Sequence, residues 1–304
     1  MAGQAKHAHS IRDWPDKTPV FEEFDDQLFQ DWTELLENEI GLYIAPERRS
    51  FLASGLRMRM RENDLRSYRK YYSRLASTAP EAEEWSLLVD CLKVHETCFF
   101  RHSSSMRLVK DVVLSEALKR GVTFSALSVG CATGEEAYSL AMLVDDYCSE
   151  KGRKCSFGIT GTDISRPALR HARKGRYLIR RLADIDSSYQ RKYCRRLSSR
   201  YFEIDASLRK RVCFSHLNLR DLAKAPFGEL DLIYCHNLMI YFDREKRFDI
   251  AEGLAARLRP GGVLILGPGE LLHWKNTCME RLRYDDTLAF RRLGSAGVTQ
   301  HERN

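Results

Sequence analysis

Residues 127–136 read LSVGCATGEE and are the most informative segment of the chain. Its pattern is that of a buried strand, a tight turn bounded by Gly130 and Gly134, and the acidic first turn of a helix. Glycines let the backbone approach a ligand closely, and the strand-to-helix crossing is where an α/β sheet binds nucleotide-like cofactors. The stretch therefore predicts a cofactor pocket at the end of a buried strand.

The charge of this turn favours one class of cofactor. Glu135 and Glu136 would repel a pyrophosphate at the helix start, whereas they would attract the sulfonium and ammonium groups of S-adenosylmethionine. A structural interpretation stays open, because Thr133 and Glu136 have the T-x-x-E spacing of a capping box, which stabilises a helix without any ligand.

Length and composition restrict the class of protein. With 304 residues, 43% of them hydrophobic, the chain can form one large and one small domain. It has no apolar run of about 18 residues and no signal peptide, so we expect a cytoplasmic protein without membrane insertion. Nine scattered cysteines, none in C-x-x-C spacing, predict reduced and mostly buried thiols. The formal net charge of +7 favours an acidic partner.

Periodicity divides the chain into segments. Residues 1–20 are polar and should form a flexible extension, as should residues 294–304. Apolar residues at three- and four-residue steps predict an all-helical domain over 21–97. Residues 98–293 alternate strands and helices, which predicts a mostly parallel sheet covered on both faces. Residues 175–211 are too long for a plain connection and are predicted to form a small inserted subdomain.

The predicted elements of the larger domain follow one another at short intervals. Strands are expected at 124–129, 156–162, 212–216, 230–235 and 263–267, and helices at 103–120, 135–147, 165–173 and 243–258. Arg259-Pro260-Gly261-Gly262 is predicted to be a turn from helix to strand, and Asp285-Asp286 the turn of a closing antiparallel hairpin.

Asp163 ends the strand expected at 156–162. An acid at this position can accept both ribose hydroxyls of an adenosine cofactor, as in dinucleotide-binding folds. Asp163 is also placed to be the N-cap of a helix that begins near Ser165, and the two interpretations are compatible.

Five short motifs occur in order along the chain. They are His95-Glu96-Thr97-Cys98-Phe99-Phe100-Arg101, Thr133-Gly134-Glu135-Glu136-Ala137-Tyr138-Ser139, Asp163-Ile164-Ser165, Leu217-Asn218-Leu219 and His236-Asn237-Leu238-Met239-Ile240-Tyr241-Phe242-Asp243. In this combination, residues 21–292 resemble the CheR family of chemoreceptor glutamate methyltransferases. The resemblance implies a class I S-adenosylmethionine-dependent methyltransferase fold, with a closing hairpin and an inserted β-subdomain, after an all-helical N-terminal domain.

The resemblance also implies cofactor-binding residues. Thr97 and Arg101 would contact the methionine end of the cofactor, Glu135 its ammonium group and Asp163 the ribose. Asn218 and Leu219 would surround the adenine, and His236 with Asn237 would form the floor of the pocket. The full set is His95, Thr97, Arg101, Glu135, Asp163, Asn218, Leu219, His236 and Asn237.

Arg101 and Tyr241 are the candidate catalytic residues implied by the resemblance. A glutamate is already ionised near neutral pH and a sulfonium is a good leaving group, so methyl transfer needs alignment more than a strong base. Arg101 would orient a carboxylate, and Tyr241 would face the transferring methyl group. The structural alternatives are that Arg101 bridges the two domains and that Tyr241 packs under the sheet.

The chain departs from the family pattern at three places. The family usually has Asn at His95, Arg at His236, and G-H-S-E in place of Gly267-Pro268-Gly269-Glu270. These changes indicate a divergent member, which serves a flagellar, pilus-type or other chemosensory system. In some members the subdomain binds the receptor's C-terminal peptide beside a glycine-containing loop. Residues 193–202 contain no glycine, which predicts a member that is independent of this peptide.

Two clusters of basic residues point to an acidic partner. The first spans Arg48 to Arg74, and within it Arg57, Arg59 and Arg61 are predicted to bind the Glu-rich cytoplasmic helices of a membrane chemoreceptor. The alternative is a solvated helix face. The second cluster, from Arg166 to Arg211, would serve the same partner or another anionic surface.

Two other functions are alternatives to a monomeric, metal-independent glutamate O-methyltransferase that produces S-adenosylhomocysteine. A nucleic-acid methyltransferase would explain the basic clusters, but His236-Asn237-Leu238-Met239 is not the N-P-P-Y type of motif that holds a flipped base, and no RNA-binding module is evident. A non-catalytic scaffold of the same family would require that His95 and His236 have abolished cofactor binding.

Overall fold

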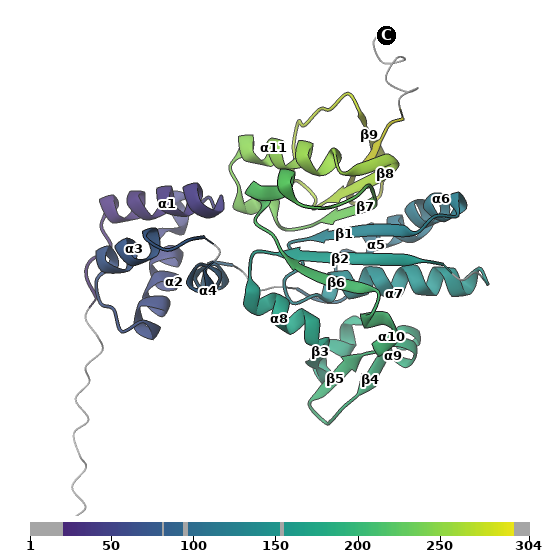
Figure 1. The fold of residues 1–304 in the computed structure, drawn as a ribbon, viewed down its shortest axis with the longest axis horizontal. Coiled ribbons are helices and arrows are strands. Elements are labelled where there is room, and N and C mark those ends of the chain that lie inside the picture. The colour runs from purple at the N-terminus through teal and green to yellow at the C-terminus, as the bar shows by residue number, and fades with distance from the viewer. Residues whose placement is uncertain (1–20, 81, 94–96, 153–154, 295–304) are drawn as a thin grey trace, which may run out of the picture.

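The computed structural model describes residues 21–80, 82–93, 97–152 and 155–294. A seven-stranded sheet forms its centre, with the strand order β6-β2-β1-β7-β8-β10-β9 (Figure 1). The strands are β1 (Phe124–Val129), β2 (Phe157–Asp163), β6 (Val212–His216), β7 (Leu230–Cys235), β8 (Leu258–Leu266), β9 (Met279–Tyr284) and β10 (Thr287–Arg292). Strands β6, β2, β1, β7 and β8 are parallel, and β10 is antiparallel to both β8 and β9. The mostly parallel sheet with a closing hairpin is thus confirmed.

Helices cover both faces of the sheet and bury its central strand β7. Every residue of β7 is buried, as expected for a parallel strand covered on both faces. The covering helices are α7 (Glu135–Glu150), α8 (Arg166–Lys174) and α11 (Arg244–Ala255). The single helix predicted for residues 103–120 is a succession of α5 (Ser103–Leu108), a π-helical turn η2 (Val109–Leu114), α6 (Ser115–Ala117) and a 3-10 turn η3 (Leu118–Arg120).

The N-terminal helices lie to one side of the sheet (Figure 1). They are α1 (Asp26–Ile40), the 3-10 turn η1 (Pro46–Arg48), α2 (Arg49–Glu62), α3 (Tyr68–Ala76) and α4 (Glu83–Cys91). Helix α1 ends at Gly41, whose φ of 75° is the left-handed conformation that glycine adopts without strain. One buried cluster runs from Trp32 through Leu56 to Leu254 and Leu266, so this helical part and one face of the sheet share a core.

The inserted subdomain lies between α8 and β6. It contains a three-stranded antiparallel sheet in the order β3-β5-β4, made of β3 (Arg176–Leu178), β4 (Cys194–Arg196) and β5 (Tyr201–Ile204). Its helical turns are η4 (Ile179–Asp184), α9 (Ser187–Tyr193) and α10 (Ala206–Arg209). The Tyr193 hydroxyl donates to Asp145 at 2.8 Å and so ties the subdomain to α7.

Two expectations from the sequence are wrong. Residues 259–262 are not a turn before the last parallel strand, because β8 already begins at Leu258 and accommodates them as a bulge between the pairs Leu230–Leu258 and Leu232–Val263. The glycine at 261 makes this possible with a φ of 81°.

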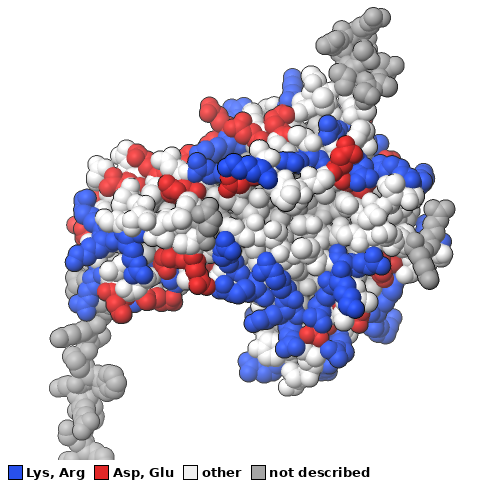
Figure 2. Space-filling model, in the orientation of Figure 1, with Lys and Arg blue, Asp and Glu red and all other residues white. Residues whose placement is uncertain are grey.

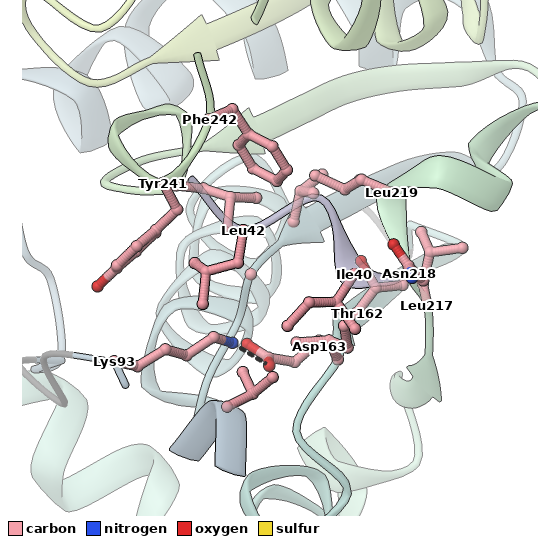
Figure 3. A pocket seen from close by; sticks show the side chains of 15 residues that line it. Ile40, Leu42, Lys93, Thr162, Asp163, Leu217, Asn218, Leu219, Tyr241 and Phe242 are labelled. Atoms are coloured by element: carbon pink, nitrogen blue, oxygen red, sulfur yellow. Dashed lines mark hydrogen bonds and ion pairs between the residues drawn. The ribbon is translucent and has the colours of Figure 1, made fainter. Parts of the chain in front are cut away.

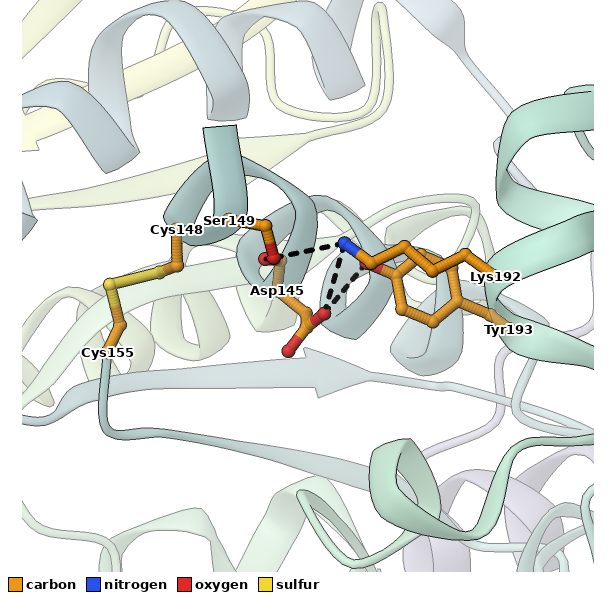
Figure 4. The surroundings of a disulfide bond; sticks show 6 residues. All are labelled: Asp145, Cys148, Ser149, Cys155, Lys192 and Tyr193. Atoms are coloured by element: carbon orange, nitrogen blue, oxygen red, sulfur yellow. Dashed lines mark hydrogen bonds and ion pairs between the residues drawn. A yellow bond between two sulfur atoms is a disulfide. The ribbon is translucent and has the colours of Figure 1, made fainter. Parts of the chain in front are cut away.

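The second concerns the thiols. Cys148, near the end of α7, is bonded to Cys155, just before β2, as Figure 4 shows. The remaining seven cysteines are free, but only Cys131 and Cys235 among them are buried. The expectation of nine reduced and mostly buried thiols is therefore corrected. None of the helices in the described ranges is long and apolar enough to cross a membrane.

Candidate active site

Two adjoining cavities open at the carboxyl ends of β1, β2 and β7. The polar cavity has a volume of about 280 Å³, and Thr97, Arg101 and His236 are among its lining residues. The apolar cavity is narrower, about 50 Å³, and includes Ile40 and Leu219 in its wall (Figure 3). Both are lined by Lys93, Gly130, Asp163, Leu238 and Tyr241. The carboxyl edge of a parallel sheet is where such folds bind their ligands.

The turn between Gly130 and Gly134 packs closely against neighbouring residues, as only glycines allow. Gly130 and Gly134 have φ values of 71° and 95°, and a Cβ on Gly134 would lie only 2.8 Å from the Ala172 Cβ. The N-cap of α7 is Gly134, with no side-chain cap. The capping box expected from Thr133 and Glu136 does not form, because the N-cap position is occupied by Gly134; the Thr133 hydroxyl donates to Glu135 at 2.6 Å.

The two glutamates of this turn have different surroundings. Glu135 is buried, burial raises its pKa, and it does not line either cavity. Glu136 lines the polar cavity and accepts a hydrogen bond from the Ser128 hydroxyl at 2.6 Å. Burial raises the pKa of Glu136 to about 8. The structure therefore brings Glu136 to the cavity, and the assignment of an ammonium group to Glu135 stays a prediction.

Asp163 lies buried between the two cavities and accepts three hydrogen bonds. The donors are the backbone N–H groups of Ala132 (3.0 Å) and Ser165 (2.8 Å) and the Lys93 ammonium (2.7 Å), which Figure 3 shows reaching the carboxylate. Burial would raise the pKa of Asp163, but Lys93 and the backbone donors outweigh it and lower the pKa. The N-cap of α8 is Ser165, whose hydroxyl accepts from the Ala168 N–H, so the N-cap interpretation of Asp163 is wrong.

Residues 97–101 contribute Thr97 and Arg101 to the lining of the polar cavity. Phe99 anchors it in the subdomain, with ring centroids 4.9 Å from Tyr177. The Phe100 N–H donates to the Ser139 hydroxyl at 2.9 Å. The contacts of Phe99 with the subdomain and of Phe100 with α7 thus position Arg101 at the cavity. His95 lies outside the described residues, so its role stays a prediction.

His236 forms part of the polar cavity at the end of β7. It is 6% exposed, and neither ring nitrogen has a hydrogen-bond partner among the described residues. Burial and the nearby His102 and Arg101 lower the pKa of His236 to about 3, so its ring is neutral. Tyr234 stacks on it, with centroids 4.5 Å apart. The neutral His236 ring thus lines the cavity, although both of its nitrogens are buried.

The loop after His236 carries the other predicted residues. Asn237 has a φ of 56°, and its side-chain nitrogen lies 3.1 Å from His102 Nε2. Tyr241, at the end of the 3-10 turn η6 (Met239–Tyr241), lines both cavities and also belongs to the buried cluster shared with the sheet, so both interpretations of this residue stay open. Buried Glu270 fixes this loop by accepting from the Met239 N–H at 3.1 Å. The divergent G-P-G-E motif thus retains a structural role for its glutamate.

Asn218 and Leu219 lie in the wall of the apolar cavity, as expected of residues around an adenine. Asn218 caps the 3-10 turn η5 (Leu219–Lys224) through the Arg220 N–H and donates to the Glu39 carbonyl at 3.4 Å. Ile40, the last residue of α1, and Leu42, just after it, also line this cavity. The apolar cavity therefore lies between the helical part and the sheet.

The basic stripe predicted on α2 is only partly available to a partner. Arg59 is 6% exposed and pairs with Glu84 at 2.7 Å and with Glu62. Arg57 donates to the Tyr68 hydroxyl at 3.2 Å, whereas Arg61 is exposed above the Phe21 ring. The prediction that Arg59 binds substrate is wrong, because the side chain holds α2 against α4.

Lys93 and His102 were not predicted from the sequence. A lysine just after α4 looks like an ordinary helix end, where cations are favourable. Only the tertiary contact with Asp163, 70 residues away, shows that Lys93 belongs to the site. His102 directly follows the motif that contains Arg101, which is the one signal that could have identified it.

The residues present fit S-adenosylmethionine. The apolar cavity suits an adenine, the carboxylate of Asp163 suits ribose hydroxyls, and Glu136 provides an acid for a cationic group. His236 contributes a neutral ring to the wall of the same cavity. Within the described ranges, no group of His, Cys, Asp and Glu side chains is arranged to hold a metal ion.

Comparison with known proteins agrees with this geometry. Residues 95–287 match the family model for the CheR methyltransferase SAM-binding domain, and residues 27–92 match the model for the CheR methyltransferase all-alpha domain. A chemotaxis protein methyltransferase of Borreliella burgdorferi is 27% identical over 79% of this chain and 86% of its own. Chemotaxis protein methyltransferase 2 of Vibrio cholerae is 29% identical over 76% of this chain and 80% of its own length. Chemotaxis protein methyltransferase 1 of Pseudomonas aeruginosa is 28% identical over 81% of this chain and 90% of its own length.

Proposed function

Because the chain belongs to the CheR methyltransferase family, we propose that it transfers a methyl group from S-adenosylmethionine to glutamate side chains of a chemoreceptor. The acceptors lie on the receptor's cytoplasmic helices, the products are glutamate methyl esters, and the protein acts as a cytoplasmic monomer. One observation carries this proposal. The polar cavity gathers Arg101, Asp163, His236 and Tyr241 from separate parts of the chain, as a site for an adenosine cofactor and a carboxylate requires.

The residues of the polar cavity act by positioning. When bound, S-adenosylmethionine would supply the methyl group for an in-line transfer from its sulfonium sulfur to a carboxylate oxygen. No proton moves, since the acceptor is already ionised. Arg101 orients the incoming carboxylate, and Tyr241 lines the wall beside the reacting groups. Glu136 in its ionised form stabilises the cation before transfer.

The proposal extends to the receptor tail. The loop between β4 and β5 is closed by the Ser198 hydroxyl, which accepts from the N–H groups of Arg200 and Tyr201 at 3.2 Å each. None of the residues 194–204 has a positive φ. This loop therefore has no glycine-type turn to hold a C-terminal peptide, which supports a member that works without this tether.

The test of the function combines binding and transfer. Calorimetry should show that S-adenosylhomocysteine binds to the purified protein without added metal. With S-adenosylmethionine carrying a labelled methyl group, a receptor cytoplasmic fragment should acquire label that mild alkali releases as methanol, because carboxyl esters are base-labile. Absence of cofactor binding would favour the scaffold alternative, and alkali-stable label would exclude a glutamate ester.

A further inference from the structure

The positive charge of the chain is concentrated in one segment. Residues 166–211, which form α8 and the inserted subdomain, contain fifteen lysines and arginines against four aspartates and glutamates, a formal charge of +11. The whole chain carries +7, so the remaining residues together carry −4. Charge separated to this degree attracts an acidic partner to one side of the molecule.

These basic side chains lie at the surface. All fifteen except Arg166, Arg181 and Arg209 are exposed. Figure 2 shows Lys and Arg side chains gathered over α8 and the inserted subdomain, below the central sheet. We name this surface the basic face.

The acids of the subdomain neutralise only part of this charge. Buried Glu203 is shared by Arg176, Arg195 and Arg209, so three cations surround one carboxylate. Arg180 on η4 and Arg191 on α9 are exposed and form no ion pair within the described ranges. Exposed charges without partners can interact with an approaching molecule without first breaking an internal contact.

The basic face borders the polar cavity. The Phe100 ring, next to Arg101, stacks on Tyr189 of α9 with centroids 5.1 Å apart. Burial and Asp184 raise the pKa of the Cys98 thiol, which lines the cavity, whereas Arg101 and Arg181 lower it. Arg181 and Asp184 of η4 thus interact electrostatically with a thiol in the cavity wall, and α9 packs against Phe100 beside Arg101, so a segment that inserts a carboxylate into the cavity would lie close to the basic face.

We propose that the basic face, around Arg180 and Arg191, is the docking surface for an acidic, Glu-rich helical segment of the methyl-accepting partner. This inference rests on the proposed function, and it assigns recognition to the inserted subdomain in place of the α2 stripe. Glutamates at helical spacing present several carboxylates on one face, so the residues beside a methyl acceptor also carry negative charge. On α2, by contrast, Arg59 is buried and Arg57 is bonded to Tyr68.

Fluorescence anisotropy with a labelled coiled-coil fragment of a receptor's cytoplasmic region tests the docking surface without requiring catalysis. The variant R180E/R191E should weaken binding of this fragment at least about fivefold at low ionic strength, and the difference should shrink near 0.5 M salt, where the screening length is only a few ångströms. The same fragment with its glutamates changed to glutamine should bind the wild type more weakly. The matched control is R281E/R283E, because these exposed arginines lie on β9, at the opposite edge of the sheet.

The outcomes separate this inference from the proposed function. Both variants should bind S-adenosylhomocysteine and unfold thermally like the wild type, since all four side chains are exposed. Equal loss of fragment binding in the two variants, or no loss in R180E/R191E, would overturn the docking surface even if methylation occurs. Loss of binding to anionic vesicles or duplex DNA in R180E/R191E, with fragment binding unchanged, would also overturn it. If the fragment binds in a way that depends on Arg180 and Arg191 but is not methylated, only the proposed function is refuted.

Discussion

Replacing Asp163 with asparagine should separate cofactor binding from folding. The carboxylate accepts hydrogen bonds from Ala132, Ser165 and Lys93, and an amide of the same shape retains one oxygen for these donors. Each buried donor that is left without an acceptor costs about 1–3 kcal/mol, so the free energy of unfolding should fall by roughly 2–4 kcal/mol. The substitution would also remove the proposed charge-assisted contact between Asp163 and the ribose. The dissociation constant of S-adenosylhomocysteine should rise roughly ten- to hundredfold, equivalent to about 1.5–3 kcal/mol.

Asp231→Asn is the matched control for this prediction. Asp231 is also buried, pairs with Arg120 and accepts from the Ser125 N–H at 2.9 Å, but it lies near the amino end of β7, away from both cavities. The Asp231→Asn substitution should lower the free energy of unfolding, measured by chemical denaturation, about as much as Asp163→Asn does. It should leave the dissociation constant of S-adenosylhomocysteine, measured by calorimetry, unchanged. An Asp163→Asn protein that binds S-adenosylhomocysteine like the wild type would refute the assignment of the ribose to Asp163.

Three further predictions concern charge and the receptor tail. Burial raises the pKa of Glu136 to about 8, and a bound sulfonium favours the ionised carboxylate, so the affinity for S-adenosylmethionine should increase as the pH rises from about 7 to about 9. Glu136→Gln should abolish this increase in calorimetry, and an identical pH profile in that variant would contradict the role of Glu136. Arg59→Ala leaves Glu84 without its main partner and should lower the free energy of unfolding by about 3–5 kcal/mol. Arg61→Ala, at an exposed position, should change this free energy little. Equal stability of the two variants would show that Arg59 does not hold α2 against α4. A peptide copying the receptor's C-terminus should not bind at micromolar concentration, and micromolar binding, or poor methylation of a receptor that lacks its tail, would contradict the independence from a tether.

Much of the fold follows from local pattern. Strand β1 was predicted at its observed residues, because an apolar run bounded by turn residues has only one compatible position. Strand β8 begins several residues earlier than the sequence predicts. Pro260 and its two neighbouring glycines are typical of a turn, and the bulge that accommodates them forms only because β8 pairs with β7. The disulfide between Cys148 and Cys155 was missed because its spacing acquires meaning only when α7 and β2 are placed side by side.

The candidate site was predicted as a set of residues but not in its contacts. Arg101, Asp163 and Tyr241 line one cavity, as motifs far apart in the sequence implied. The pairing of Lys93 with Asp163 and the burial of Arg59 depend on the packing of α4, which no local pattern specifies. For charged residues the sequence thus indicates which side chains are present, and only the tertiary structure shows which of them are already paired.

The most direct test of the central claim is mass spectrometry of a receptor cytoplasmic fragment after incubation with the purified protein and S-adenosylmethionine. The account predicts that glutamate side chains of the fragment gain the mass of one methylene group, that alkali removes it, and that Arg101→Ala abolishes the gain. Methylation confined to lysine, arginine or nucleic acid, or unmodified glutamates alongside bound cofactor, would contradict it.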